Sequence, residues 1–397
     1  VVDLINMGEV PFPGETNLAE LLLQVRQEDL LKASIDTTQA VQLADTVVVV
    51  VPVIVDETAK PDFSAIDSAT RDIAGGLKQN TLICYETTLP IGTTRNRFGP
   101  LLQEISGLDY ETDFYLAYSP ERVFSGRIFA DLRTYPKLVG GINDQSTQRA
   151  ITFYESVLDF DDRPDLDQPN GVWNLGKSEA AEMAKLIETT YRNVNIALAN
   201  EFAIHAEELS IDIGNVIQAS NSQPFSHIHN PGVAVGGHCI PVYPKFYLST
   251  HENASLPQAA ISVNESMPIR AVEQLKRSFG NDVAKKRVAI LGAAYRGGVK
   301  ETAFSGVFSL VTQIANNGWD PLVHDPLYTD TELIELGFQP FALGESCDAA
   351  IIQTDHEVYK EITSKDLPEA QYLYDGRRIL SQNQIEPITL LQLGSGL

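Results

Sequence analysis

Two stretches of the sequence alternate short apolar runs with segments of helical periodicity, and this alternation restricts the folds that the chain can adopt. The apolar runs of the first stretch are TVVVVVP (46–52), NTLICYETT (80–88), DFYLAYS (113–119) and PKLVGG (136–141). Segments such as FSAIDSATRDIAGGL (63–77) lie between them at helical spacing. Runs rich in β-branched and aromatic residues are typical of strands that are buried on both faces of a sheet. We therefore predict a parallel sheet with crossover helices.

The second stretch repeats the pattern after a long helical segment. Its apolar runs are KKRVAILG (285–292), WDPLVHDP (319–326), CDAAIIQTDH (347–356) and AQYLYDGRRIL (370–380). The segment from about 178 to 210 contains neither Pro nor Gly, and Ser178 can cap its start. These patterns predict an α/β chain with two Rossmann-like, doubly wound parallel-sheet domains, joined by a long central helix and a helical middle domain. The predicted domains cover residues 1–165, 166–275 and 276–397.

One expected element has no counterpart in the first 80 residues. A dinucleotide-binding sheet normally opens with a strand and the pattern G-x-G-x-x-G, followed about 20 residues later by an acidic residue for the ribose. Residues 1–80 contain no such pattern. We therefore expect the chain to start inside the first domain, after an opening βαβ segment of roughly 30 residues.

Composition excludes several kinds of partner. The formal net charge of −24 argues against general nucleic-acid binding, because a phosphate backbone would be repelled by most of the surface. No apolar run reaches the roughly 18 residues of a membrane span, so we expect no membrane insertion. The 3 cysteines are widely spaced and odd in number, which argues against a disulfide framework and favours the cytoplasm.

The densest chemical signal is the segment NPGVAVGGHCIPVYP (230–244). Cys239 follows two glycines, Gly236 and Gly237, which allow the backbone to approach a ligand closely. A thiol in such a loop is accessible to a substrate and can act as a nucleophile, although a buried structural cysteine beside a tight turn gives the same pattern. No His/Cys/Asp spacing in the chain indicates a metal site.

Five motifs resemble one known family. GGHCIPV (236–242), SPERV (119–123), ETTLPIGTT (86–94), AEMAKLIETTYRNVNIALANE (181–201) and VAILGAAYRGGVKE (288–301) are similar to motifs of the UDP-glucose/GDP-mannose dehydrogenase family, in the family's order. The central and thiol motifs look most like the branch that oxidises UDP-N-acetylhexosamines, such as UDP-N-acetylmannosamine or UDP-N-acetylglucosamine. The alternatives are the same chemistry on UDP-glucose or GDP-mannose, and a catalytically weak protein that binds nucleotide sugars.

The resemblance implies an oxidation of a sugar C6 alcohol to a carboxylate, with NAD as the cofactor and a nucleotide sugar as the substrate. In this family a cysteine, here Cys239, adds to the intermediate aldehyde as a thiohemiacetal, and a thioester is then hydrolysed. Lys185 matches the lysine that stabilises the oxyanion and favours the thiolate. Glu121 matches the glutamate that helps to activate water. Thr88 matches a threonine at the end of a strand, and Thr189 stands on the catalytic helix.

Further binding residues follow from the same match. The expected cofactor-binding residues are Val51, Pro52, Thr87 and Thr88. The expected substrate-binding residues are Arg122, Arg192, His229, Gly236, Gly237, Tyr295 and Arg296. The resemblance also implies a homodimer formed through the long central helix.

The chain departs from the family pattern at several of these positions. Thr189 stands where the family usually has an asparagine, and Tyr243 stands where an aspartate often follows the nucleophile. A phenol is a poor base at neutral pH, because its ordinary pKa is about 10. Val53 replaces a usual threonine, and Arg296 takes the place of a phosphate-binding lysine. We expect Glu121 to carry more of the hydrolytic step as a result.

Overall fold

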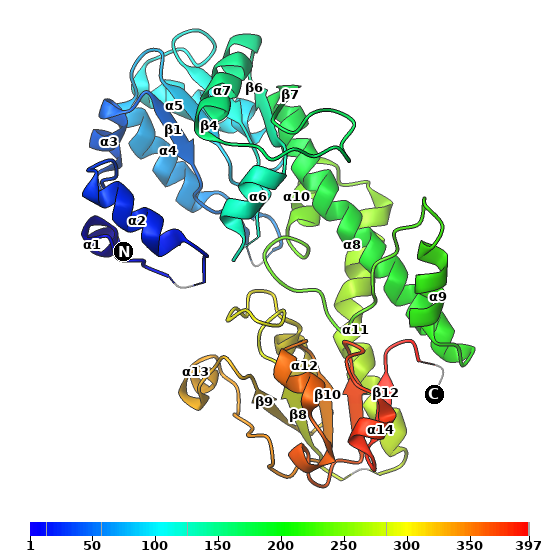
Figure 1. The fold of residues 1–397 in the computed structure, drawn as a ribbon. Coiled ribbons are helices and arrows are strands. Elements are labelled where there is room, and N and C mark those ends of the chain that lie inside the picture. Colours follow the sequence, from blue (N-terminus) through cyan, green and yellow to red (C-terminus); the bar gives the residue numbers. More distant parts are fainter. Residues whose placement is uncertain (13, 57, 125, 283, 396–397) are drawn as a thin grey trace. The chain divides into compact units, whose positions relative to one another are not determined.

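The computed structural model describes residues 1–12, 14–56, 58–124, 126–282 and 284–395 (Figure 1). These residues form two compact units. The first unit contains Val1–Glu188 and Lys245–Thr250, and the second contains Thr189–Pro244 and His251–Leu397. Each unit is built around one five-stranded sheet.

The sheet of the first unit has the strand order β1-β4-β5-β6-β7. Its strands are β1 (Thr46–Val49), β4 (Leu82–Tyr85), β5 (Tyr115–Tyr118), β6 (Lys137–Gly141) and β7 (Val172–Lys177). A separate two-stranded ribbon joins β2 (Ile54–Val55) and β3 (Pro61–Asp62). Strand β4 is buried along its whole length, as its unbroken apolar run predicts.

Strands β5 and β6 are antiparallel, whereas β1, β4 and β5 are parallel to one another. Our prediction of a parallel sheet is therefore wrong for this pair. The chain between β5 and β6 leaves and re-enters the sheet at the same edge, so the first residue of β6 lies at the edge where β4 and β5 end. The register pairs Ala117 with Gly141 and Tyr118 with Gly140, and its continuation brings Glu121 opposite Lys137.

Helices cover this sheet and the remainder of the first unit. They are α1 (Val2–Met7), α2 (Leu18–Gln27), α3 (Thr37–Leu43), α4 (Ser64–Gly76), the π-helical η1 (Thr94–Phe98), α5 (Gly99–Ser106), α6 (Ile128–Thr134), α7 (Asp144–Val157) and α10 (Tyr243–Thr250). Helix α7 packs against the sheet through Ala150, Ile151 and Tyr154. Asn143 caps its start, because the Asn143 side chain accepts a hydrogen bond from the Ser146 amide.

The long helix α8 (Ser178–Glu208) has 31 residues and confirms the predicted helical segment. A glycine or proline inside a helix weakens it by about 1–3 kcal/mol, and α8 contains neither. Its first residues belong to the first unit, and Thr189 begins its part in the second unit.

The sheet of the second unit is parallel throughout and has the order β12-β11-β10-β8-β9. Its strands are β8 (Arg287–Leu291), β9 (Asp320–His324), β10 (Ala349–Ile352), β11 (Tyr372–Asp375) and β12 (Thr389–Gln392). Its other elements are α9 (Ile213–Asn221), α11 (Ser255–Phe279), α12 (Gly306–Asn316), α13 (Asp330–Glu335), α14 (Gln382–Ile385) and the 3-10 helices η2 (Glu357–Glu361) and η3 (Ser364–Asp366).

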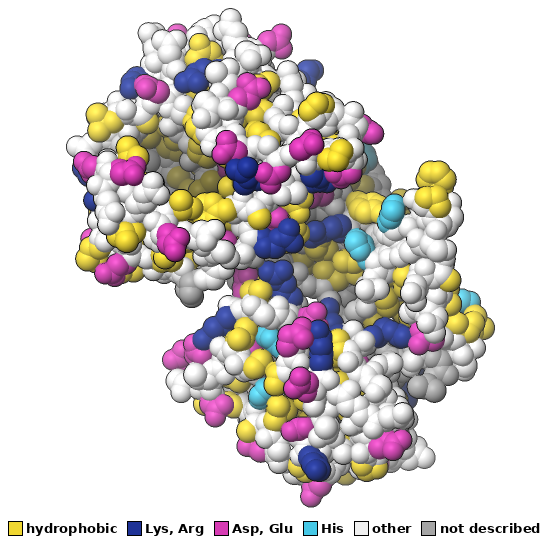
Figure 2. Space-filling view, viewed as in Figure 1, with side chains coloured by type: hydrophobic (Ala, Val, Ile, Leu, Met, Phe, Trp, Pro, Cys, Tyr) yellow, Lys and Arg dark blue, Asp and Glu magenta, His cyan; other side chains and the backbone are white. Residues whose placement is uncertain are grey.

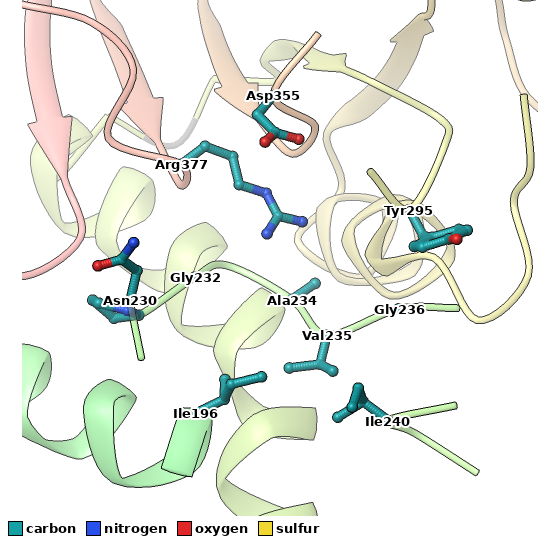
Figure 3. Close-up of a pocket in the computed structure, with 11 residues that line it drawn as sticks. Ile196, Asn230, Gly232, Ala234, Val235, Gly236, Ile240, Tyr295, Asp355 and Arg377 are labelled. Atoms are coloured by element: carbon teal, nitrogen blue, oxygen red, sulfur yellow. The ribbon is translucent and has the colours of Figure 1, made fainter. Parts of the chain in front are cut away.

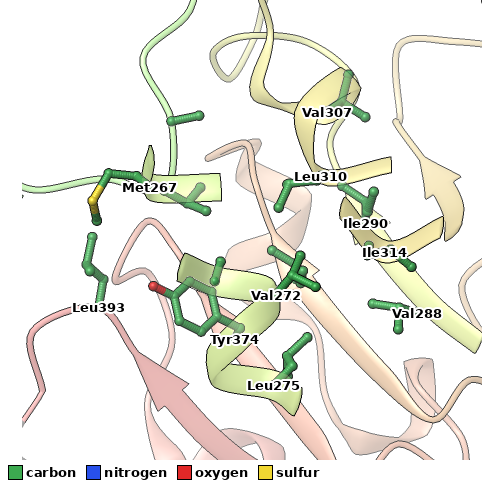
Figure 4. Close-up of a cluster of buried hydrophobic side chains, with 14 of the residues drawn as sticks. Met267, Val272, Leu275, Val288, Ile290, Val307, Leu310, Ile314, Tyr374 and Leu393 are labelled. Atoms are coloured by element: carbon green, nitrogen blue, oxygen red, sulfur yellow. The ribbon is translucent and has the colours of Figure 1, made fainter. Parts of the chain in front are cut away.

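The core of the second unit lies between this sheet and two helices. Figure 4 shows Val272 and Leu275 of α11 near Val288 of β8, with Leu310 and Ile314 of α12 beside them. All five side chains are almost completely buried. Full burial of such a side chain contributes about 1.5–3 kcal/mol, so this cluster holds α11 and α12 on the sheet.

The predicted α/β class with two sheet domains is confirmed; the second sheet is parallel throughout, and the first is parallel except for the β5–β6 pair. The same patterns did not predict β7 or β12. Among the residues that the structure describes, no helix is both long enough and apolar enough to cross a membrane.

Candidate active site

Three charged side chains meet at the edge of the first sheet where β4 and β5 end. The Lys137 Nζ atom lies 3.1 Å from Glu86 Oε1 and 3.3 Å from Glu121 Oε2. Glu86 directly follows β4, and the Glu121 amide donates a hydrogen bond to the Glu86 carbonyl at 3.2 Å. Burial alone would lower the pKa of Lys137, but the two carboxylates outweigh that effect and raise it. The Lys137 ammonium is therefore a fixed positive charge between two acids.

Tyr154 of α7 extends this cluster below the sheet edge. The Tyr154 hydroxyl donates to Glu86 Oε1 at 2.5 Å, and the Cys84 Sγ atom lies 3.2 Å from the Tyr154 hydroxyl oxygen. The Lys137 Nζ atom is 4.9 Å from the centre of the Tyr154 ring. Burial raises the pKa of the Cys84 thiol to about 12, so this thiol is protonated and unreactive at neutral pH.

Lys185 reaches the same sheet edge from helix α8. Its Nζ atom donates to the Glu121 backbone carbonyl at 2.6 Å, and the Lys185 side chain is buried. Glu188, one turn further on, pairs with Arg122 at 3.0 Å. Thr189 is also buried. Lys185 and Thr189 are therefore not part of a solvent-exposed polar face of α8. The structure brings Lys185, Glu121 and Arg122 together.

The predicted cofactor-binding residues follow the paired ends of β1 and β4. The Thr87 hydroxyl donates to the Val51 carbonyl at 2.7 Å, and Thr88 beside it is buried, whereas Pro52 is exposed. This pair of strand ends fits one part of an NAD site, since ligands of open α/β sheets bind at the carboxyl ends of the strands. The described residues of this unit contain no G-x-G-x-x-G turn for the pyrophosphate.

In the second unit, the loop with Cys239 packs against the turn that follows β8. A Cβ atom at Gly236 would lie 2.6 Å from the Tyr295 Cβ atom, and one at Gly237 would lie 3.0 Å from the Tyr295 ring. The Gly237 amide donates to the Ala303 carbonyl at 2.9 Å. Only glycine allows this approach, which explains both glycines before the thiol. Cys239 itself is half-buried.

The charged groups around Tyr295 affect its pKa. Burial raises the pKa of Tyr295, Arg296 acts to lower it, and Glu301 and Cys239 add to the increase. His238, which precedes the thiol, lies 2.8 Å from Glu301 through its Nε2 atom. The structure thus brings Cys239, Gly236, Gly237 and Tyr295 together.

A pocket of about 320 Å³ adjoins this loop (Figure 3). Its walls are formed by Ile196, Asn230, Pro231, Gly232, Ala234, Val235, Gly236, Ile240, Tyr295, Asp355 and Arg377. Figure 3 shows the Arg377 guanidinium directed into the pocket, with Asp355 beside it. The Arg377 Nε atom donates to the Gln353 carbonyl at 2.6 Å, which holds the side chain in this direction. A guanidinium so placed can pair with a phosphate.

Several amides of the glycine-rich turn after β8 are already hydrogen-bonded within the protein. The Ala293 and Ala294 amides donate to the Asp325 carboxylate at 2.8 and 2.9 Å. The Gly297 amide donates to Asp355 Oδ1 at 2.8 Å, and the Gly298 amide donates to His356 Nδ1 at 3.2 Å. The Gly297 and Gly298 amides are therefore already paired with protein side chains.

His229 and Arg192 lie together on the helical side of the second unit. The His229 amide donates to Asn195 Oδ1 at 2.8 Å. Burial lowers the pKa of His229, and the Arg192 charge adds to that decrease. The His229 Nε2 atom is buried without a hydrogen-bond partner, so the neutral ring has an open position for a ligand group. Arg296 also has a buried Nε atom without a partner.

The acidic surface does not form one patch. Figure 2 shows Asp and Glu side chains scattered over the visible face of both units, with Lys and Arg among them. A chain with a formal net charge of −24 must therefore hold an anionic ligand through local cations. Among the described residues, no group of three or more His, Cys, Asp and Glu side chains is placed to hold a metal ion.

Three residues of these sites were missed by the sequence reasoning. Lys137 and Glu86 lie within predicted strand runs, and Arg377 lies within the run 370–380. The available signal was a charged residue inside an otherwise apolar run, since such a residue is almost never fully buried without a partner.

Comparison with known proteins accounts for this arrangement. Residues 1–158 match the NAD binding domain of the UDP-glucose/GDP-mannose dehydrogenase family, residues 179–267 match its central domain, and residues 289–382 match its UDP binding domain. Together with the two sheets and the thiol loop, these matches define an NAD-dependent dehydrogenase of nucleotide sugars. The chain belongs to the UDP-glucose/GDP-mannose dehydrogenase family, as its motifs indicate.

Individual relatives agree with this assignment. The chain is 33% identical over 330 residues to the UDP-N-acetyl-D-mannosamine dehydrogenase of Pyrococcus horikoshii, which covers 81% of this chain and 75% of that protein. It is 28% identical over 400 residues to the Escherichia coli enzyme of the same name, covering 95% and 90%. The solved structure of the UDP-D-ManNAc dehydrogenase from Pyrococcus horikoshii superposes with a TM-score of 0.87 at 29% identity, covering 100% of this chain and 91% of that chain.

Proposed function

We propose that the protein oxidises the C6 alcohol of a UDP-N-acetylhexosamine, most specifically UDP-N-acetylmannosamine, to the uronic acid, with Cys239 as the nucleophile. The observation that carries this proposal is the Cys239 loop, which closes on Tyr295 beside the pocket that contains Arg377. Similar proteins that are named UDP-N-acetyl-D-mannosamine dehydrogenases support the choice of sugar.

The overall reaction converts the CH₂OH group and one water to a carboxylate and transfers two hydrides. Bound NAD⁺ supplies the hydride acceptor at each oxidation. The Cys239 thiolate adds to the aldehyde carbon, and the resulting thiohemiacetal holds the aldehyde until the second oxidation gives a thioester. Lys185 is assigned to the oxyanion, where a well-placed donor contributes on the order of 3 kcal/mol. This role requires Lys185 and Cys239 to meet in the reacting protein.

Glu121 is assigned to the hydrolysis of the thioester. It accepts the proton of the attacking water, and the thiol leaves as the carbon–sulfur bond breaks. Lys185 supports Glu121 through the 2.6 Å hydrogen bond to its carbonyl, and Thr88 supports the same strand-end region. Thr189 would contribute one hydroxyl donor in place of an amide.

The nucleotide is assigned to the second unit. Arg377 would pair with the diphosphate, and Tyr295 and Arg296 would line the path from the pocket to the thiol. Gly236 and Gly237 would keep the loop close to the ligand. Arg122, Arg192 and His229 are further candidates for the sugar and phosphates. Val51, Pro52, Thr87 and Thr88 are the candidates for the cofactor.

The test is turnover of the full chain with NAD⁺ and individual nucleotide sugars. UDP-N-acetylmannosamine should yield two NADH per uronate, and Cys239→Ser should abolish uronate formation. Faster turnover of UDP-glucose or GDP-mannose would replace the proposed substrate. Binding of UDP-sugars without NADH formation would instead favour the catalytically weak alternative, which the replacements Thr189 and Tyr243 motivate.

A homodimer through α8 is part of the proposal. Apolar side chains are exposed along this helix at spacings of four and seven residues, at Met183, Ile187, Tyr191, Leu198 and Phe202. Such a stripe favours pairing with a second copy. A monomeric mass in solution, measured by light scattering, would contradict this assignment.

Two further assignments accompany this function. We retain the division into a cofactor domain (1–165), a central domain (166–275) and a nucleotide-sugar domain (276–397), which the ranges of the family matches support. The cytoplasm is the proposed compartment, and the three free cysteines support a reducing environment.

A further inference from the structure

We propose that Lys137 is a positioning residue, which pairs electrostatically with Glu121 and directs its carboxylate toward the substrate by standing between Glu121 and Glu86. The role of Glu121 in hydrolysis rests on the proposed function, whereas the effect of Lys137 on Glu121 can be measured without turnover. The proposal follows from the geometry at the edge of the first sheet.

The antiparallel course of β6 creates this contact. Lys137 is the first residue of β6, and the β5–β6 register continues to bring it opposite Glu121. Its Nζ atom is 3.1 Å from Glu86 Oε1 and 3.3 Å from Glu121 Oε2. The two carboxylates therefore lie within two hydrogen-bond lengths of each other.

Burial makes the ammonium necessary for this pair of acids. The Lys137 side chain is 6% exposed and that of Glu86 is 10% exposed, whereas that of Glu121 is 35% exposed. Two carboxylates at such a separation repel one another, and in a poorly solvated site one of them takes up a proton. Since Glu121 is the more exposed of the two, its outer side is available to a substrate while Lys137 holds its inner side.

Other charged and titratable groups also face this cluster. They are Cys84 on β4, Tyr154 on α7, Lys185 and Glu188 on α8, and Arg122 beside Glu121. Three of these groups each contact a different atom near Glu121. Tyr154 donates to Glu86, Lys185 donates to the Glu121 backbone carbonyl, and the Arg122 amide donates to Glu121 Oε1 at 2.6 Å. The Lys137 Nζ atom contacts the Glu121 carboxylate itself, at 3.3 Å from Oε2.

The experiment follows the protonation of Glu121 directly. Carboxyl ¹³C NMR of the glutamate-labelled full chain gives a titration curve for Glu121, which is assigned by the signal that disappears in Glu121→Gln. Lys137→Met should move the midpoint of that curve to higher pH by about one unit. Lys137→Arg keeps the charge and should leave the midpoint near that of the parent protein. Glu86→Gln removes the competing acid and should move the midpoint to lower pH.

The opposite directions of these shifts separate a positioning role from a structural one. Loss of packing at Lys137 alone would not predict a downward shift in Glu86→Gln, and an unchanged midpoint in both Lys137→Met and Glu86→Gln would overturn the proposal. Circular dichroism identifies any variant that does not fold, and Glu86→Gln then decides, since it leaves Lys137 in place.

Turnover provides the link to catalysis. The acid limb of the pH–rate profile should move with the NMR midpoint in each variant. A shifted midpoint with an unshifted profile would remove Glu121 from the rate-limiting hydrolysis, and the positioning role of Lys137 in catalysis would fall with it. If the parent protein oxidises no nucleotide sugar, the proposed function fails, while the NMR titration still decides whether Lys137 governs Glu121.

Discussion

The two sheets carry acidic residues at comparable edges but use them differently. At the first sheet, Glu86 and Glu121 contact a lysine side chain, and Glu121 is partly exposed. At the second sheet, Asp325 accepts from the amides of Ala293 and Ala294 in the turn after β8. Asp325 fastens the backbone of its own unit, whereas Glu121 is partly exposed and remains available to a ligand.

The difference shows how one type of sheet serves two purposes. Because several amides of the turn after β8 already have acceptors, we expect the second unit to hold a nucleotide through side chains such as Arg377. The first unit leaves the strand ends Thr87 and Thr88 beside the charged cluster. Four substitutions test this division, in order of decreasing expected effect.

Asp325→Ala should destabilise the second unit by at least about 3 kcal/mol. The substitution leaves the amides of Ala293, Ala294 and Leu327 without their acceptor, and each buried unpaired donor costs about 1–3 kcal/mol. Urea unfolding monitored by tryptophan fluorescence measures the loss; of the two tryptophans, Trp319 lies in the second unit. Asp325→Asn, which retains one acceptor oxygen, should lose less. Equal stability of all three proteins would mean that this carboxylate does not fasten the turn.

Glu121→Gln should have the complementary effect at the first sheet. We expect stability within about 1 kcal/mol of the parent protein and a roughly 10²-fold to 10³-fold slower thioester hydrolysis, because a general base is lost. Single-turnover measurements of NADH separate the first hydride transfer from the later steps. Equal slowing of both steps would contradict a specific role in hydrolysis.

Glu182→Gln tests a carboxylate that fastens backbone inside the first unit. Glu182 accepts from the Thr94 amide at 2.8 Å and the Thr94 hydroxyl at 2.7 Å. Burial nevertheless raises the pKa of Glu182 to about 7, and hydrogen bonds from Thr94 only partly oppose it. A raised folded-state pKa gives stability that is present below about pH 4.5 and is lost as the pH rises to about 7.

Between pH 4.5 and about 7, ionisation of Glu182 should lower the free energy of unfolding by roughly 3 kcal/mol. Glu182→Gln should remove this pH dependence. Thermal unfolding at several pH values between 4.5 and 7 measures the slope. The Asp325 pKa moves the other way, since hydrogen bonds from His356 and the backbone outweigh burial and lower it. The contribution of Asp325 is therefore lost as the pH falls, and an unchanged slope in Glu182→Gln would contradict the raised pKa.

Arg377→Met should weaken nucleotide-sugar binding about tenfold, because a charge-assisted contact with the diphosphate is removed. The change should appear in KM, with kcat within about threefold of the parent value. Calorimetric titration with UDP alone measures the same contact without the cofactor. Arg377→Lys serves as the matched variant, and it should recover part of the affinity. Unaltered UDP binding in both variants would place the nucleotide elsewhere.

Apolar pattern predicted most strands and the long helix. The run 80–88 contains β4, and the segment 178–210 contains α8, because continuous burial and the absence of helix breakers are local properties. Strand β7 carries Asn174 and Lys177 among half-exposed residues, and β12 has one buried residue among four, so neither produces a strong pattern.

The apolar pattern did not predict the direction of β6. An apolar run shows that a strand forms but not which way it crosses the sheet, since direction depends on the packing of the preceding connection. An assumption of parallel strands places Lys137 at the opposite edge from Glu121. The cluster with Glu86 was therefore missed, although Glu121 and Lys185 were identified from the motifs. Arg377 was missed for a related reason, because β11 ends at Asp375 and leaves Arg377 in the loop beyond.

The unequal burial of the three thiols allows Cys239 to be labelled selectively. Burial raises the pKa of Cys84 and Cys347 to about 12, and both side chains are inaccessible. An alkylating dye applied near neutral pH should thus attach once per folded chain, at Cys239, without any engineered cysteine. The dye stoichiometry would count intact loops in a preparation, and protection by a bound nucleotide sugar would report occupancy in real time.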